Sequence, residues 1–579
     1  MIARRMLAGY SSAFTTQQRS GPRAAQSIRA RKPDGTTIAG SLMRTDFDVV
    51  ILGSGLSGLA AAVAATHLGL KPIVIEKAAK LGGGTVDSYG ILWVGQNHLA
   101  EQAGIADDLR KTRDYVHFLA GGEASDAKLN AFVNRSPAAL KFFQTCGVPF
   151  RLVKDFPDHY YGLAPGAVRE GRSLEVELIS GADLGPWQDK VRRPERQIYH
   201  LTFEDQVALG GMNSLTDVRD QLEARKTRDM RGKGIGLISH FVKLLLQREV
   251  PILTKTATRE LIMAKTGIAG IVTRSGTRIK ARHGVILATG GYESNPTLVE
   301  AFERMPGWVS PSPRELDGDG LRLGIEAGGF TQVIRNNLVS FLGLAVPQSN
   351  GKARFHPAYL EELCSPHTIV VNRSGARFGD ETNFQMLVPK LKLFSAQTHA
   401  YENLPAFLIF DRQYAENFSC AGSPKGAPIP DWIARSPTIE GLAAKLGVDE
   451  AGLVTTVDRF NGFARSGQDR DFHRGELAFR FSTKKDPTLR VASVGTIEQA
   501  PFYGVELCTS GFSSAGLLTD VNSRVLDHSH QAIAGLYALG NTSAHTEFGV
   551  GYQAGFSHTS SLTFGYLAAR HLLKRATAR

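Results

Sequence analysis

The chain has 579 residues, of which 42% are hydrophobic and 21% are charged, a composition typical of a soluble globular protein. Its length is too great for one hydrophobic core and predicts two or three domains. The net charge of +12 at pH 7 is concentrated in residues 1–44, where eight basic residues against one aspartate account for +7. We therefore expect no nucleic-acid partner, and the lack of any run of about 18 apolar residues argues against a transmembrane segment.

Residues 1–44 are rich in serine, arginine and alanine and contain no sustained apolar run. We interpret them as a basic, disordered N-terminal extension; a transit-type presequence or translation from an upstream start codon are the alternatives. The four cysteines are scattered without a Cys-x-x-Cys pair, at positions 146, 364, 420 and 508. This spacing favours neither a disulfide framework nor a metal site, so we expect no bound metal and a reducing, cytoplasmic location.

The first predicted elements form a nucleotide-binding unit. Residues 46–52 predict a buried strand, 57–68 an alanine-rich helix and 72–76 a second strand, with Gly-Ser-Gly-Leu-Ser-Gly joining the first two. In this G-x-G-x-x-G turn, Gly53 permits the tight bend and Gly55 lets a pyrophosphate approach the backbone.

Two further residues complete this pattern. Gly58 lets the helix pack against the strand, and Glu76 ends the second strand 18 residues later. The free N–H groups and the positive dipole at the start of the helix would face phosphates, and the Glu76 carboxylate would accept hydrogen bonds from the hydroxyl groups of an adenosine ribose. The sequence therefore predicts a dinucleotide site.

Later segments with glycines are expected to reach the same site. They favour FAD over NAD, because FAD is longer and needs binding residues along its whole length. They are a linker closing in Gly82-Gly83-Gly84-Thr85, a strand at 284–289 running into Gly290-Gly291, and a strand at 534–539 leading to Gly540-Asn541. This arrangement resembles the FAD-binding half of the fumarate reductase and succinate dehydrogenase flavoprotein superfamily. No histidine stands directly before Thr85, so we expect the FAD to be non-covalent. The predicted cofactor-binding residues are Gly53, Ser54, Gly55, Leu56, Ser57, Gly58, Glu76, Lys77, Gly83, Gly84, Thr85, Ser88, Gly90, Ala288, Thr289, Gly290, Gly291, Asp319, Gly540 and Asn541.

The rest of the chain divides by pattern. A strand at 269–273 joins the other core strands, residues 77–270 are otherwise largely helical, and from 341 to 505 short strands alternate with prolines. We predict an α/β fold, with a Rossmann-like FAD-binding domain interrupted by an α+β substrate-capping domain. The FAD-binding domain would comprise 45–340 and 506–579, and the cap 341–505. Further helices are predicted at 98–119, 126–145, 234–249, 411–417, 438–459 and 556–574, and another begins at Gly318-Asp319-Gly320.

Several strings resemble the 3-ketosteroid Δ1-dehydrogenase group within this superfamily, and the resemblance runs from about residue 46 to 573. The resemblance implies FAD-dependent desaturation of the carbon–carbon bond next to a ketone in a cyclic substrate. The strings include Gly171-Arg172-Ser173-Leu174-Glu175, Asp183-Leu184-Gly185-Pro186-Trp187, Val371-Asn372-Arg373-Ser374-Gly375-Ala376-Arg377-Phe378 and Arg459-Phe460-Asn461-Gly462-Phe463.

In that group, the resemblance implies that three tyrosines and one glycine amide serve the ketone. Tyr160, shortly before a Pro-Gly, aligns with the first tyrosine. The second would lie four residues beyond Glu381, where this chain has Gln385, which cannot act as a base. The third belongs to a Tyr-Pro-Gly-Pro-Gly loop after His-Thr; here the loop is longer, and we expect Tyr552 to take the carbonyl-facing role. The catalytic candidates are Tyr160, Tyr552, Tyr161 and His545.

Desaturation beside a ketone needs hydrogen-bond donors at the carbonyl oxygen and a base near the α carbon. Two of the catalytic features of the resembled group are altered here: the second tyrosine is absent and the loop of the third is longer. We therefore expect the substrate to be a small apolar ketone, either a 3-ketosteroid or a smaller cyclic ketone. We also expect an electron acceptor, which is unidentified. One alternative is a fumarate reductase-like enoate reductase, although the segment 398–404 lacks the arginine acid of that class. The other is a non-catalytic flavoprotein. We also expect Arg377 and Glu381 to form an ion pair that braces the cap.

Overall fold

The computed structural model describes residues 46–195, 198–209, 218–334, 340–358, 362–476 and 489–578. The basic extension predicted at 1–44 lies outside these ranges. Residues 45–579 cluster as one compact unit, so the predicted division into a FAD-binding domain and a cap stays a prediction.

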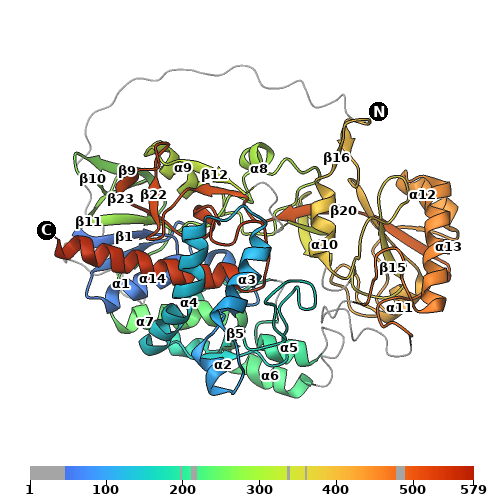
Figure 1. Cartoon of the computed structure of the whole chain (residues 1–579), viewed down its shortest axis with the longest axis horizontal. Coiled ribbons are helices and arrows are strands. Elements are labelled where there is room, and N and C mark those ends of the chain that lie inside the picture. Colours follow the sequence, from blue (N-terminus) through green and yellow to red (C-terminus); the bar gives the residue numbers. More distant parts are fainter. Residues whose placement is uncertain are drawn as a thin grey trace. The chain divides into compact units, whose positions relative to one another are not determined.

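A sheet of eight described strands holds the nucleotide-binding unit, and its centre is parallel (Figure 1). Strand β1 (Asp46–Leu52) lies between β2 (Pro72–Ile75) and β11 (Arg278–Leu287), and β23 (Ala532–Ala538) follows β11. The second half of β1 is buried throughout, which is typical of a parallel strand covered on both faces. The five core strands predicted from the sequence are confirmed in this sheet. The strand predicted at 269–273 is β10 (Gly267–Thr273). The other members of the sheet are β8 (Ile252–Leu253), β9 (Thr258–Ala264) and β22 (Arg524–Leu526).

Two helices from opposite ends of the described chain pack together beneath this sheet. They are α1 (Leu56–His67) and α14 (Phe556–Thr577), and both confirm the sequence prediction (Figure 1). A Cβ at Gly565 would lie 3.2 Å from the backbone nitrogen of Ala61, so a glycine allows the two helices to approach closely. Their buried residues share one core with β1 and with α7 (Lys233–Gln247). The other face of the sheet packs against α8 (Pro296–Phe302), α9 (Asp319–Glu326) and the strand pair β12 (Thr331–Val333) and β21 (Ala515–Leu517).

The segment after β2 contains helices in the three predicted regions, but it also contains short strands that were not predicted. The single helix expected at 98–119 is wrong: α2 (His98–Gln102) and α3 (Leu109–Ala120) are separate. Gly104 follows α2 with a φ of +74°, and the Asp108 side chain caps α3, which explains the break. Helix α4 (Asp126–Cys146) confirms the next prediction. The smaller elements here are η1 (Gly83–Asp87), β3 (Leu92–Trp93), β4 (Phe150–Leu152), β5 (Ser173–Val176), β6 (Ile179–Ser180), η2 (Gly181–Lys190), α5 (Phe203–Ala208), α6 (Arg219–Thr227) and β7 (Met230–Arg231).

A second sheet, antiparallel throughout, is formed by the segments between 340 and 511. Its order is β14 (Ala353–Pro357), β13 (Ser340–Pro347), β20 (Phe502–Gly511), β18 (Ala406–Phe410) and β15 (Thr368–Val371), with β19 (Ala434–Ser436) also paired to β20. Strand β20 crosses the predicted boundary between 505 and 506. The sheet of the expected cap therefore continues into the C-terminal segment.

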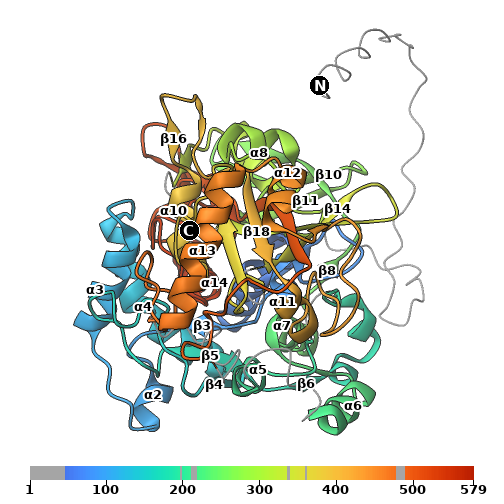
Figure 2. The same cartoon turned by 90° about the vertical axis from the view of Figure 1, so that its right-hand side faces the viewer.

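Helices α12 (Ile439–Leu446) and α13 (Glu450–Ser466) cover one face of this second sheet (Figure 2). The single helix expected at 438–459 is wrong, because Gly447 ends α12 with a φ of +68° and Asp449 caps α13. The remaining elements are α10 (Phe384–Leu391), β16 (Phe394–Ser395), β17 (Ala400–Tyr401), α11 (Arg412–Asn417) and η5 (Gly540–Thr542).

Four buried charges brace the second sheet. The Arg377 guanidinium binds the Glu381 carboxylate at 2.8 Å and Asp469 at 2.9 Å, and Arg474 binds Glu381 at 3.1 Å. All four side chains are at most 4% exposed. The predicted Arg377–Glu381 pair is confirmed as part of this larger cluster, in which each charge is neutralised by an opposite one.

All four cysteines are buried and unbridged. Among the described residues, no helix combines the length and the apolar character needed to cross a membrane.

Candidate active site

The start of helix α1 is shaped by three glycines with different jobs. A Cβ at Gly53 would lie 2.2 Å from the Ala288 carbonyl oxygen, and a Cβ at Gly58 would lie 2.1 Å from the Gly53 carbonyl oxygen. These two positions therefore exclude any side chain. Gly55 instead caps the helix without a side-chain hydrogen bond, and a Cβ there would find only the Thr85 hydroxyl, 3.8 Å away. The N-terminus of α1 thus faces open space, where an anion can bind its N–H groups.

Glu76 stands at the end of β2 and is held by three hydrogen bonds. One carboxylate oxygen accepts from the Ser54 backbone N–H at 3.0 Å and from the Ser54 hydroxyl at 2.6 Å; the other accepts from the Ala78 N–H at 2.8 Å. The side chain is buried but lines the cavity described below. Its lone pairs are not exhausted by three donors, so hydroxyl groups of a ribose can still bind it.

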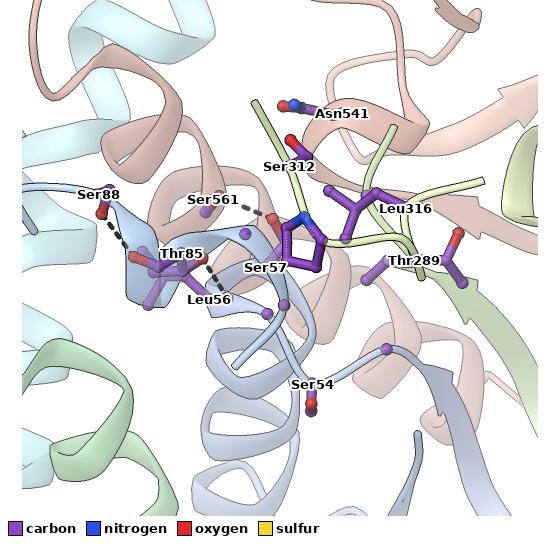
Figure 3. A pocket seen from close by; sticks show the side chains of 18 of the residues that line it. Ser54, Leu56, Ser57, Thr85, Ser88, Thr289, Ser312, Leu316, Asn541 and Ser561 are labelled. Carbon is purple, nitrogen blue, oxygen red and sulfur yellow. Dashed lines mark hydrogen bonds between the residues drawn. The ribbon is translucent and has the colours of Figure 1, made fainter. Parts of the chain in front are cut away.

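The turn η1 lies against the start of α1 (Figure 3). The Thr85 hydroxyl accepts the Leu56 N–H at 3.2 Å, and the Ser88 hydroxyl donates to the Thr85 carbonyl at 2.6 Å. Arg192 donates to the Gly83 carbonyl at 2.8 Å and pairs with Asp87. Arg192, although paired with Asp87, lines the cavity and can donate to a phosphate group, as can the N-terminus of α1.

The opposite wall comes from three segments far apart in the sequence (Figure 3). The Thr289 hydroxyl accepts the Gly320 N–H at 2.9 Å, and the Thr542 hydroxyl donates to the Gly290 carbonyl at 2.9 Å. A Cβ at Gly290 would lie 3.1 Å from the Leu316 side chain and one at Gly84 would lie 3.4 Å from it, so Leu316 stands next to both glycines. These contacts join the loop after β11, the start of α9 and the turn after β23.

Together these walls enclose a cavity of about 520 Å³. It is lined by all of the predicted cofactor-binding residues except Gly58 and Gly291. Gly58 instead allows the helix to approach the strand, as predicted. A Cβ at Gly291 would lie 2.1 Å from the Ser513 hydroxyl, so Gly291 makes room for neighbours behind the wall.

One end of the cavity is formed by Tyr552, by Phe341 of the second sheet and by Phe512, which directly follows β20. The Tyr552 ring lies 5.6 Å from the His159 ring and 6.4 Å from the Phe341 ring, and Phe512 packs edge-on to Phe341 at 5.5 Å. Burial raises the pKa of Tyr552 to about 12. The phenol is therefore neutral at pH 7 and suited to donate a hydrogen bond.

Gln553 lies beside Tyr552 and also lines the cavity. Its side-chain oxygen accepts the Tyr115 hydroxyl at 2.5 Å and the His159 backbone N–H at 2.8 Å. Burial raises the pKa of Tyr115 well above its usual value, although a hydrogen bond from the Tyr160 backbone opposes the rise. A neutral Tyr115 keeps its proton available for Gln553.

The other catalytic candidates lie outside the cavity lining. Tyr160 is buried, its hydroxyl has no hydrogen-bond partner among the described residues, and burial raises its pKa. Tyr161 is 42% exposed, so the geometry gives its predicted role no support. His545 is hydrogen-bonded to Asn541 at 3.0 Å and to Glu547 at 3.2 Å. Through Asn541, which does line the cavity, His545 is one residue removed from it.

Sequence reasoning missed several residues that line the cavity. Ser557 and His558 could have been found, because the predicted helix at 556–574 begins beside the Tyr552 loop and its first turn must face the same site. Phe341 and Phe512 carried no local signal, since Phe341 lies on β13, Phe512 directly follows β20, and only the tertiary fold brings these segments to the flavin-binding residues. The missed lining residues include Arg192, Phe341, Phe512, Gln553, Ser557, His558 and Ser561.

The sequence matches the model of the FAD binding domain family over residues 48–555. That match spans most of the chain and both halves of the cavity. The chain belongs to this family of flavoproteins. Its cofactor is FAD.

Known members of the family include similar enzymes. The chain is 34% identical to 4-oxocyclohexanecarboxylate 2-dehydrogenase of Sinomonas cyclohexanicum, over 92% of this chain and 94% of that protein. It is 32% identical to 3-oxosteroid 1-dehydrogenase of Mycolicibacterium smegmatis, over 92% and 98%. Among solved structures, 3-ketosteroid Δ1-dehydrogenase of Sterolibacterium denitrificans matches with a TM-score of 0.78 and 27% identity, covering 92% of this chain and 100% of that one. The resemblance inferred from the sequence is confirmed.

The residues present fit FAD. The N-terminus of α1, left open by Gly55, and Arg192 suit its pyrophosphate, and Glu76 suits a ribose. At the other end, the aromatic walls and the polar groups of residues 552–558 suit a flat ring system with carbonyl oxygens.

Proposed function

We propose that this enzyme desaturates the carbon–carbon bond next to the ketone of a cyclic substrate. The observation that carries the proposal is the pair of polar side chains, Tyr552 and Gln553, set among aromatic rings at one end of the FAD cavity. The activities of the relatives support it, since all of those named above act on a ketone in a ring.

The chemistry follows from the acidity of a C–H bond next to a ketone. A base removes the α proton, negative charge moves onto the carbonyl oxygen, and a double bond forms as the β hydrogen leaves with its electron pair. FAD, when bound, supplies the acceptor for that hydride. The protein stabilises the step by donating hydrogen bonds to the oxygen, which typically contributes about 3–4 kcal/mol per donor.

The tyrosines of this chain suit the role of donor better than the role of base. Burial raises the pKa of both Tyr552 and Tyr160, which disfavours the phenolate that a base requires. We therefore assign Tyr552 as a donor to the ketone oxygen. Tyr160 lies outside the cavity lining, so we assign it no step of the reaction.

An apolar cluster borders the cavity at Tyr552. Phe341, Phe355, Val388 and Cys508 form one buried apolar cluster, and Tyr552 packs against it. Of these, Phe341 also lines the cavity. We propose a monocyclic ketone as the substrate class, in line with the six-membered ring named for the relative with 34% identity.

The test is to mix the oxidised holoenzyme anaerobically with a panel of steroid and monocyclic ketones and to follow bleaching of the flavin absorption. Rapid bleaching by monocyclic ketones is the expected result, and bleaching by steroids alone would overturn the substrate class. Reoxidation of the reduced enzyme by an unsaturated acid, with no bleaching by any ketone, would favour an enoate reductase. No reaction in either direction would favour a non-catalytic flavoprotein.

A further inference from the structure

Gln553 lies in a glycine-rich loop, but its side chain is buried and fixed by hydrogen bonds. Its side chain is 1% exposed, yet it lines the cavity directly after Tyr552. Two donors bind its side-chain oxygen: the Tyr115 hydroxyl at 2.5 Å and the His159 backbone N–H at 2.8 Å.

These two contacts fix which way the carboxamide points. A backbone N–H can only donate, so the atom 2.8 Å from His159 N must be the acceptor oxygen of Gln553 and not its NH₂ group. The NH₂ group therefore points away from Tyr115 and His159. Its recorded contact is a long one, 3.4 Å to the Ala554 carbonyl. Since the group carries two hydrogens, at least one N–H has no partner among the described residues.

The groups that hold Gln553 are themselves rigid. Tyr115 is fully buried and stacks on Trp93 at 5.6 Å. The Trp93 indole N–H donates to Asp158 at 2.7 Å, and Arg172 pairs with Asp158 at 2.9 Å. Asp158 directly precedes His159, so the same buried network places both donors to Gln553.

We propose that Gln553 is a second side-chain donor, beside Tyr552, to the ketone oxygen of the substrate. This inference rests on the proposed function and adds a catalytic residue to it. An amide N–H held in place before the reaction stabilises the charge that develops on the oxygen without having to reorient. Tyr115 acts through Gln553 and is a positioning residue.

The location favours the substrate over other carbonyl groups. Gln553 adjoins Tyr552, whose ring contacts Phe341 of the second sheet, whereas the phosphate-facing groups lie around Gly55 and Thr85. The amide N–H is thus at the apolar end of the cavity. A flavin carbonyl is the other oxygen that could occupy this end, and the experiment separates the two.

The decisive variants are Gln553→Glu and Gln553→Met. The first keeps the oxygen that Tyr115 and His159 bind but replaces the NH₂ group with a second acceptor. The second removes the donor without adding charge. The probes are cyclohexanone, for the rate of flavin reduction, and a series of substituted phenols, whose anions resemble the enolate, for equilibrium binding. The control is Gln499→Glu, an exposed glutamine whose side-chain oxygen accepts a hydrogen bond from Arg412.

We expect both Gln553 variants to retain FAD and to lower the rate constant of flavin reduction about 100-fold. A hydrogen-bond donor binds a more basic phenolate oxygen more tightly, so in the unsubstituted enzyme the affinity should depend on the pKa of the phenol. Without the donor, both variants should show a weaker dependence of affinity on phenol pKa. Tyr115→Phe should produce a smaller change of the same kind, and the control should match the unsubstituted enzyme.

An unchanged dependence on phenol acidity in Gln553→Met overturns the inference. If the absorption and reduction potential of its unliganded flavin change instead, the amide faces the flavin and the inference is equally overturned. The phenol measurement does not require turnover. Failure of the proposed function, seen as no reduction by any ketone in the unsubstituted enzyme, is therefore distinguishable from failure of the Gln553 assignment.

Discussion

The two ends of the FAD cavity are built in different ways. At the phosphate end the backbone shapes the site: Gly53 and Gly58 permit close approach, and Gly55 leaves the N-terminus of α1 open to a ligand. At the Tyr552 end, side chains do the work, and they come from α3, the loop after β4, the second sheet and the loop before α14. A backbone-built site tolerates few substitutions at its glycines, whereas a side-chain-built site can be altered one group at a time.

The largest effect should come from breaking the phosphate end. In Gly53→Ala the new methyl group would lie 2.2 Å from the Ala288 carbonyl oxygen, at a residue whose φ is +104°. We expect the protein to be purified without FAD, as measured by the ratio of flavin to protein absorbance. Gly69→Ala is the matched control, since Gly69 also has a positive φ, +84°, but a Cβ there meets nothing within 4 Å. Gly69→Ala should lower the free energy of unfolding by only about 1 kcal/mol, and the variant should retain FAD. Retention of full flavin content by Gly53→Ala would contradict the assignment.

The second sheet can be weakened without touching the phosphate end. Glu381→Gln removes the carboxylate shared by Arg377 and Arg474, and leaving buried charges unpaired should lower the free energy of unfolding by about 3–5 kcal/mol. Urea unfolding followed by circular dichroism measures this loss, while the flavin content should stay unchanged. The control is Glu498→Gln, whose pair with Arg465 is exposed and should contribute less than about 1 kcal/mol. Equal losses in the two variants would show that the buried cluster does not brace the sheet.

At the Tyr552 end, removing one hydroxyl should affect the rate and spare the cofactor. We expect Tyr552→Phe to slow reduction of the flavin by a cyclic ketone about 100-fold to 1000-fold, because a donor to the developing oxyanion is lost. Stopped-flow absorbance measures the rate constant. Tyr161→Phe, at an exposed position, should leave it unchanged. A slow Tyr161→Phe together with an unaffected Tyr552→Phe would reverse the two assignments.

The smallest expected effect is a loss of folding stability at low pH. Burial acts to raise the pKa of Glu547, but Lys128, with His545 and Ser560, lowers it to about 2 from a usual 4.5. A carboxylate with a depressed pKa stabilises the folded state above its unfolded pKa, here by about 3 kcal/mol, and that contribution is lost as the pH falls from about 4.5 towards 2. The free energies of unfolding of the enzyme and of Glu547→Gln should therefore converge over that range. Parallel pH profiles would contradict this account.

Most of the correct predictions from the sequence depend on patterns among neighbouring residues. The strands around β1, helices α1 and α14 and nearly all of the predicted cavity lining depend on residues close together in sequence, where glycine spacing and apolar periodicity report directly on the backbone. The two helix predictions that were wrong, at 98–119 and 438–459, failed at a glycine of positive φ followed by a capping aspartate. That signal was present but was outweighed by the helical pattern on either side.

The substrate end depends on contacts that no local pattern encodes. Nothing near Gln553 in the sequence points to Tyr115, which is 438 residues away, or to His159, which is 394 residues away. The direction of its amide is a property of those two donors and not of the loop itself.

The sequence by itself determined the cofactor class, the central sheet and the glycines that admit a dinucleotide, because backbone geometry leaves its mark on neighbouring residues. Only the tertiary structure decided that Tyr161 faces solvent, that Tyr552 and Gln553 face the cavity, and that aromatic side chains from distant segments close its end. Side-chain direction and burial are set by distant packing partners, and those partners meet only when the chain is folded.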